Sequence, residues 1–221
     1  KYYGQGAGLV KALDGIDLEI EKGKFTMIVG PSGSGKTTFL NLLGGQDRPT
    51  EGRIWVEGTR IDTLKESRLA VYRRNKVGFV YQNFNLIPML TVEENILFPL
   101  EMGNERPDRG FFEELVETLG LGDRLSALPG ELSGGQRQQT AIARALIARP
   151  ALVLADEPTG NLDTKSGQNV LGLLKMMNRK YRQTIVMITH DLDIAQTADR
   201  IVRIEDGRLA EGRGGYGAPG Q

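Results

Sequence analysis

A glycine-rich segment, residues 30–37 with the sequence GPSGSGKT, constrains the fold of this chain more than any other feature. It matches the pattern G-x-x-x-x-G-K-[ST], follows the apolar run 25–29 and precedes a helix that we predict over residues 36–43. The glycines let the backbone curl so that several N–H groups face one point, where the helix N-terminus adds partial positive charge. We therefore predict a phosphate loop between a buried parallel strand and a helix.

The residues of the phosphate loop predict binding of a nucleoside triphosphate together with Mg²⁺. Lys36 supplies a point charge to the β- and γ-phosphates, and the Thr37 hydroxyl can bind the metal ion. The alternative, a glycine–serine turn with a solvated lysine, does not account for the flanking strand and helix. The nucleotide-binding residues that we predict here are Gly30, Pro31, Ser32, Gly33, Ser34, Gly35, Lys36, Thr37 and Thr38. This segment leaves open which reaction follows binding.

A second apolar run, residues 151–155, brings two acidic residues to the carboxyl end of a buried strand, where open α/β sheets bind their ligands. Asp156 is the expected Mg²⁺ partner of the phosphate loop, directly or through water. Glu157 is placed to polarise the water that attacks the γ-phosphate. A solvated acidic turn is the alternative, and the apolar run before it in a chain with a phosphate loop favours the site.

The remaining apolar patterns predict an α/β fold with a mostly parallel sheet. Residues 184–188 form a third buried strand, and an amphipathic helix precedes it, with Val170, Leu173, Leu174 and Met177 at helical spacing. Alternation of strand, helix and strand implies right-handed crossovers between parallel strands. Residues 53–58, and 201–204 with 208–211, carry antiparallel hairpin signals. Residues 86–148 are helical in pattern, with Phe112, Leu115, Val116 and Leu119 on one face.

A second anion site is indicated by residues 132–136, the signature segment LSGGQ, which comes before another predicted helix. Ser133 offers a hydroxyl, Gly134 and Gly135 expose backbone amides, and a helix N-terminus points at whatever binds there. A serine-capped helix after a glycine turn explains these residues equally well when they are taken alone. One chain that holds one nucleotide does not need a second such site.

The order of these motifs closely resembles the ATPase subunit of ABC transporters. It runs from the phosphate loop through Gln82, the signature segment and the acidic pair to residues 160–163 and His190, and the resemblance covers residues 3–211. The resemblance implies a P-loop NTPase (RecA-like) core that binds ATP and Mg²⁺. It divides a single domain into an ATP-binding core, 1–85 and 150–211, a helical subdomain, 86–149, and a flexible tail, 212–221.

The resemblance also implies a head-to-tail dimer and individual roles. The signature segment of one subunit, residues Ser133, Gly134, Gly135 and Gln136, would close over the nucleotide held by the other. Tyr3 would stack on the adenine ring, a role that another group could fill, and Asp163 would link the two sites. Gln82 would contact Mg²⁺ and water, and His190, the only histidine, would hold the γ-phosphate. Glu157, His190 and Gln82 form the expected catalytic set.

Within the family, residues 84–88 and 158–163 resemble one branch, which includes ATPases of macrolide exporters, lipoprotein-releasing systems and bacitracin-type peptide resistance transporters. Gln139 and Thr140 stand where much of the branch has Arg-Val, so the subfamily stays open. We expect a subunit that powers a membrane permease, for export or mechanical extraction of a hydrophobic molecule, peptide or lipoprotein. The alternative is an ATPase that drives a membrane signalling or mechanotransmission complex without moving a solute.

The composition of the chain limits the kinds of partner that we expect it to bind. Lys+Arg and Asp+Glu both number 28, and this balance argues against a nucleic-acid partner, whose phosphates demand a basic excess. No run approaches the ~20 apolar residues of a membrane-spanning helix, and the first residues do not resemble a signal peptide. We expect no direct membrane insertion and a location at the cytoplasmic face of the cell membrane, through a transmembrane permease. Apolar residues in 84–90 and 96–100 form either core or a docking groove for that permease.

Overall fold

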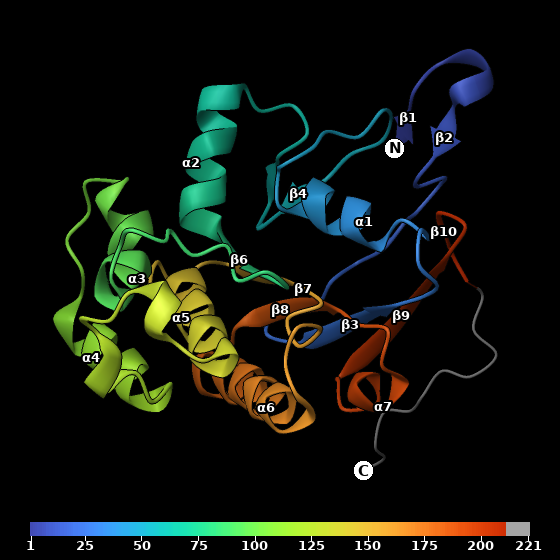
Figure 1. The fold of residues 1–221 in the computed structure, drawn as a ribbon. Helices are drawn as coiled ribbons and strands as arrows, with labels where there is room; N and C mark the ends of the chain where they lie inside the picture. The colour runs from blue at the N-terminus through green and yellow to red at the C-terminus, as the bar shows by residue number, and fades with distance from the viewer. Residues whose placement is uncertain (211–221) are drawn as a thin grey trace, which may run out of the picture.

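Parallel strands form the centre of the molecule, which the computed structural model describes over residues 1–210. The central sheet has the strand order β10-β9-β3-β8-β7-β6, and only β10 is antiparallel to its neighbour (Figure 1). Its strands are β3 (Phe25–Val29), β6 (Val77–Tyr81), β7 (Leu152–Asp156), β8 (Thr184–Ile188), β9 (Arg200–Glu205) and β10 (Arg208–Leu209). The α/β fold with a mostly parallel sheet confirms the predicted fold class.

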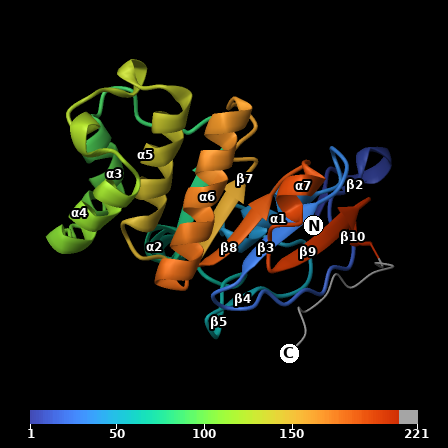
Figure 2. The ribbon, with the colours of Figure 1, turned by 90° about the horizontal axis from the view of Figure 1, so that it is seen from below.

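Two layers of helices cover the two faces of this sheet, as Figures 1 and 2 show. The helices are α1 (Lys36–Leu43), α2 (Glu66–Lys76), α3 (Val92–Glu101), α4 (Arg109–Thr118), α5 (Gly134–Leu146), α6 (Thr164–Tyr181) and the short α7 (Leu192–Ala195). Successive strand residues alternate between two buried clusters. Met27 and Val29 join the cluster of α3 to α7, whereas Ile28 joins that of α1 and α2. Helices α5 and α1 therefore lie on opposite faces of the sheet.

The predicted elements agree with the structure at the strands and helix that flank the phosphate loop and differ elsewhere. Strands β3 and β8 and helix α1 have the predicted bounds, and β7 begins and ends one residue later than expected. The predicted hairpins form between β9 and β10 and between β4 (Trp55–Val56) and β5 (Thr59–Arg60). A further two-stranded sheet joins β1 (Tyr2–Tyr3) to β2 (Val10–Lys11). Strand β6 and helix α2 were not predicted.

Residues 86–149 contain α3, α4 and α5, as the helical pattern predicts. The face expected for α4 needs a correction, because Phe111, Leu115 and Val116 are its buried residues and Phe112 is only partly buried. The division of the chain into a core and a helical subdomain stays a prediction. The predicted tail, 212–221, lies outside the described residues. Every helix within residues 1–210 is too short or too polar to cross a membrane.

Candidate active site

Backbone crowding requires glycine at two positions of the phosphate loop. Gly30 has φ 150°, and a Cβ there would overlap the carbonyl oxygen of Ile204 in β9. Gly35 has φ 101°, and a Cβ there would overlap the carbonyl oxygen of Ala12. The loop is therefore pressed against two neighbouring segments and adopts backbone angles that L side chains rarely reach. Its curled shape follows from its glycines.

The phosphate loop carries the groups that an anion needs. Helix α1 begins after Gly35 without a side-chain cap, so its first backbone N–H groups lack the partner that a cap provides. Lys36 is largely buried, and its Nζ donates to the carbonyl oxygens of Gly30 at 2.9 Å and Pro31 at 2.7 Å. The Ser34 hydroxyl is buried and has no hydrogen-bond partner within residues 1–210. The uncapped backbone amides of α1, the Lys36 ammonium and the Ser34 hydroxyl are all groups that bind phosphate.

Asp156 and Thr37 meet at the carboxyl end of β7. Burial raises the pKa of the Asp156 carboxyl, while a hydrogen bond from the Thr37 hydroxyl lowers it. The neighbouring charge of Glu157 raises the same pKa, and that of Lys36 lowers it. A hydroxyl and a carboxylate from two elements thus lie together beside the loop. Such hard oxygen ligands fit Mg²⁺, which keeps waters and takes further oxygens from a phosphate.

Glu157 and His190 face each other just beyond two neighbouring strands. Strands β7 and β8 are parallel, with Asp156 paired to Ile188, so the residues that follow both ends meet. Nδ1 of His190 lies 3.2 Å from Oε2 of Glu157. The Glu157 backbone has φ 45°, a left-handed conformation that is uncommon for a residue with a side chain. The histidine side chain is 72% exposed, which leaves it open to a ligand.

Gln82 lies next to this pair because β6 is parallel to β7, with Tyr81 paired to Asp156. Its Nε2 donates to Oδ1 of Asn161 at 3.1 Å, and Nδ2 of Asn161 donates back to the Gln82 carbonyl oxygen at 3.2 Å. Gly160 packs so closely on Gln82 that a Cβ there would lie 2.7 Å from Nε2. Asn161 was predicted only as part of a motif, and its bonds to Gln82 were not foreseen.

The signature segment leads into α5. Ser133 caps this helix, since its hydroxyl accepts from Gln136 N at 3.2 Å and Gln136 Oε1 accepts from Ser133 N at 2.9 Å. The structure therefore shows the capping role, while anion binding at this helix stays a prediction. Gly134 and Gly135 pack against Leu162 and Ser166, at the start of α6. This second helix N-terminus belongs to the sheet face opposite α1 (Figure 2).

Asp163 and Tyr3 bond to residues outside the phosphate loop and the acidic pair. Asp163 caps α6 by accepting from Ser166 N at 3.0 Å, and the Ser166 hydroxyl lowers the pKa of its carboxyl. Tyr3 donates its hydroxyl to Oδ2 of Asp47 at 2.6 Å. Burial raises the pKa of Tyr3 and the Thr38 hydroxyl lowers it, so the Tyr3 hydroxyl lies near the first turn of α1.

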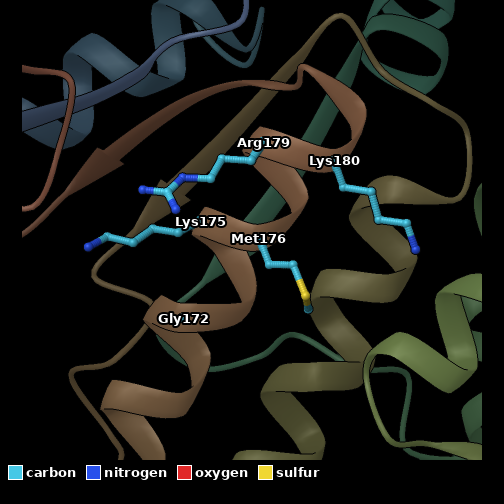
Figure 3. Close-up of a pocket in the computed structure, with 5 residues that line it drawn as sticks. All are labelled: Gly172, Lys175, Met176, Arg179 and Lys180. Carbon is cyan, nitrogen blue, oxygen red and sulfur yellow. The ribbon is translucent and has the colours of Figure 1, made fainter.

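Two hollows of the surface lie away from these residues. One is on the outer face of α6, lined by Gly172, Lys175, Met176, Arg179 and Lys180 (Figure 3). There Lys175 and Arg179 extend to one side of the helix and Lys180 to the other. The second hollow lies where several segments meet, among them Lys22, Phe111 and Tyr181. The predicted site residues line neither hollow. The phosphate loop, the acidic pair, His190 and Gln82 lie instead at the ends of the parallel strands or on segments that follow them.

Comparison with known proteins agrees with this geometry. The profile of a family described as "ABC transporter" matches residues 13–160. The chain is 46% identical to the lipoprotein-releasing system ATP-binding protein LolD of Pseudomonas syringae pv. tomato, over 96% of this chain and 94% of that protein. It is also 46% identical to the macrolide export ATP-binding/permease protein MacB of Rhodopirellula baltica, over 96% of this chain but only 31% of that protein.

A solved structure is similar over nearly the whole length. It is a dimeric, post-hydrolysis state of an ATP-binding cassette bound to ADP and Pi, from Methanocaldococcus jannaschii. The TM-score is 0.86 and the sequence identity is 40%, with 96% of this chain and 94% of that chain covered.

Proposed function

The chain belongs to the ABC transporter family, and from this premise we propose that it is the ATP-hydrolysing subunit that powers a membrane permease. One observation carries the proposal. The Thr37–Asp156 contact and the Glu157–His190 pair lie together at the strand ends beside the phosphate loop. A metal-binding pair, a base and a phosphate cradle in one place are the parts that hydrolysis of a nucleoside triphosphate requires.

The phosphate loop binds the triphosphate of ATP. Its backbone amides and the Lys36 ammonium contact the β- and γ-phosphates, and Lys36 gives up its bonds to the Gly30 and Pro31 carbonyls as it does so. Thr37, Asp156 and Gln82 would hold Mg²⁺, which would neutralise charge on the phosphates. The remaining binding residues are those of the loop itself, Pro31, Ser32, Gly33, Ser34, Gly35 and Thr38.

Glu157 acts as the general base. Its carboxylate, just beyond the end of β7, takes the proton of the attacking water. His190 contacts Glu157 and holds the γ-phosphate from its exposed side. Gln82, fixed by Asn161, orients the water and the metal ion. These roles divide hydrolysis among loops that follow three neighbouring strands, β6, β7 and β8.

Two copies of the chain complete the catalytic sites by a head-to-tail contact. In this arrangement Ser133, Gly134, Gly135 and Gln136 of one subunit close over the ATP held by the other. The dimeric state of the similar cassette supports this, as does the separation of α5 from α1 across the sheet. Asp163 links the two sites, since its cap partner Ser166 also contacts Gly135 of the signature segment.

The permease contacts the surface after Gln82, and this contact holds the subunit at the cytoplasmic face of the membrane. Part of the expected groove is core, because Ile96 and Leu100 are buried. Met89 is 80% exposed, and Leu86 is only half-buried. Relatives named for macrolide export, lipoprotein release and bacitracin export support a hydrophobic molecule, peptide or lipoprotein as the substrate.

The substitution Glu157→Gln tests the hydrolytic function. A positioned general base contributes about 10²–10⁴-fold in rate, so turnover should fall by that factor while ATP binding changes little. Steady-state phosphate release and equilibrium ATP binding measure the two effects on the purified chain. Glu93→Gln is the matched control, because Glu93 is an exposed glutamate in the first turn of α3. Near-normal turnover of the Glu157 variant would assign the base to another residue.

A further inference from the structure

The segment that follows Gln82 has an unusual backbone. Phe84 has φ 61° and Asn85 has φ 49°, so two consecutive residues with side chains adopt the left-handed region. Single residues other than glycine visit this region occasionally, and consecutive ones need support from their surroundings. Two consecutive left-handed residues also direct their carbonyl groups to the same side, as in a helical turn. The two carbonyl oxygens of this pair therefore present one acceptor surface.

Arg144 occupies this acceptor surface. Its Nη1 donates to the Asn85 carbonyl oxygen at 2.6 Å, and its Nη2 donates to the Phe84 carbonyl oxygen at 2.9 Å. Within residues 1–210 this guanidinium forms no ion pair with a carboxylate, and burial lowers its pKa. Among the described residues, this partly buried cation thus donates its hydrogen bonds to backbone carbonyls. The planar fork of arginine suits two adjacent acceptors, whereas a lysine ammonium acts as a single point.

The same helix holds the end of β6 by further contacts. Arg144 lies in the last turns of α5, the helix that the signature segment begins. Gln138 of α5 donates to the Tyr81 carbonyl oxygen at 3.4 Å, one residue before Gln82. Gly78 of β6 lies so close to α5 that a Cβ there would overlap the Ala145 carbonyl oxygen. Close packing of this kind transmits small shifts between the two elements.

We propose that Arg144 is a positioning residue, which fixes the Phe84–Asn85 pair and thereby links the signature helix α5 to the placement of Gln82. A shift of α5 when the signature segment contacts a nucleotide carries the guanidinium with it. The Phe84–Asn85 pair moves with the guanidinium, and Gln82 and the exposed Met89 move with the pair. This inference rests on the proposed function for the roles of Gln82 and the signature segment, but not for the existence of the clamp.

Amide hydrogen exchange in the ATP-free chain tests the clamp. Phe84 N donates to the Tyr81 carbonyl oxygen and Asn85 N to that of Asn83, so both amides report on the pair. In Arg144→Met these two amides should exchange about tenfold faster or more, the scale of a lost charge-assisted hydrogen bond. The Ile87 amide, held by Asn95 Oδ1 at 2.8 Å, and the amides of α5 should keep their rates. Equal acceleration throughout, or none, would overturn the proposal.

Two substitutions at Asn85 disturb the same pair from its other side. The Asn85 side chain is exposed, so valine and glycine change mainly the preference for positive φ. Asn85→Val should accelerate exchange as Arg144→Met does, while Asn85→Gly should behave like the original chain. The double variant Arg144→Met with Asn85→Val should exchange no faster than either single variant. Additive effects would mean that Arg144 acts only through packing of α5, which contradicts the clamp.

Turnover separates this inference from the proposed function. Arg144→Met and Asn85→Val should lower kcat by about tenfold, on the scale of the broken interaction, and leave the affinity for ATP unchanged. Arg144→Lys should recover part of the rate, because one of the two bonds can re-form. Faster exchange of the Phe84 and Asn85 amides with unchanged kcat would support the clamp but refute its link to the placement of Gln82, which Asn161 would then fix without it. Unchanged exchange would refute the clamp whatever happens to kcat.

Discussion

The hydroxyl of Tyr3 is already hydrogen-bonded in the chain without nucleotide. The hydroxyl donates to Asp47 at 2.6 Å, and Nζ of Lys1 lies 4.7 Å from the ring centroid. These contacts fix the ring while leaving the residue 40% exposed. A fixed, partly exposed aromatic ring next to Thr38 can stack on a base without paying much conformational entropy. The ring, and not the hydroxyl, is then the part that contributes to binding.

Substitution of Tyr3 separates these two parts. Tyr3→Ala should weaken ATP binding by about tenfold, because base–aromatic stacking contributes about 1–3 kcal/mol. Tyr3→Phe keeps the ring, loses only the bond to Asp47, and should bind ATP nearly as well as the original chain. Isothermal titration with ATP measures both variants. Equal affinities of the alanine and phenylalanine variants would show that another group stacks on adenine.

At the residue scale, sequence reasoning was most specific where one short segment contains the whole signal. Lys36, Thr37 and Asp156 were predicted as site residues because each follows an apolar run that predicts its strand, and their binding roles stay predictions. The bonds of Asn161 to Gln82 and of Arg144 to Phe84 were not predicted. Their partners are 79 and 60 residues apart in the chain, and nothing in the local pattern joins them. Only the order of β6 and β7 in the sheet brings Asn161 to Gln82.

Strand β6 shows why some elements were not predicted from the sequence. Its sequence, VGFVY, contains a glycine, and glycine is depleted in strands. That glycine is required by α5, whose Ala145 carbonyl oxygen leaves no space for a Cβ at Gly78. Glycine is thus required at position 78 because of a contact with α5, which is distant in the sequence. Helix α2 was missed for another reason, since Leu69 and Tyr72 are its only buried residues and leave a weak apolar pattern.

Ser133 has two possible roles at the start of α5, and substitutions can separate them. Ser133→Asp keeps a good N-cap and adds a negative charge where a phosphate is expected, so hydrolysis should fail while thermal stability is retained. Ser133→Ala removes the cap and should cost about 1 kcal/mol of stability, with part of the hydrolysis kept. Thermal unfolding and phosphate release measure the pair. Full turnover of the aspartate variant would contradict an anion site at this helix.

The whole molecule presents two surfaces that we propose bind nucleotide, and each is incomplete by itself. The strand order places the phosphate loop, the acidic pair and Gln82 along one edge of the sheet. The signature segment leads into α5, which packs on the face opposite α1 (Figure 1). In the dimer that we propose, the phosphate loop of one chain pairs with the signature segment of a second copy, which completes both surfaces. Such a two-fold arrangement repeats the same contact twice and closes.

Mixing two inactive variants tests this arrangement. Lys36→Met removes the charge that contacts the phosphates, and Ser133→Asp places a repelling charge at the signature segment. Each variant alone has two defective sites per dimer and should not hydrolyse ATP. In the mixed dimer the intact phosphate loop of one chain meets the intact signature segment of the other, while both defects fall in the second site. An equal mixture should therefore recover up to about a quarter of the original rate, since about half of the dimers are mixed and each has one intact site.

A single chain carrying both substitutions, mixed with the original chain, controls for subunit exchange, because its mixed dimers contain two defective sites. Absence of recovery in a mixture whose subunits demonstrably exchange would show that each site is built within one chain.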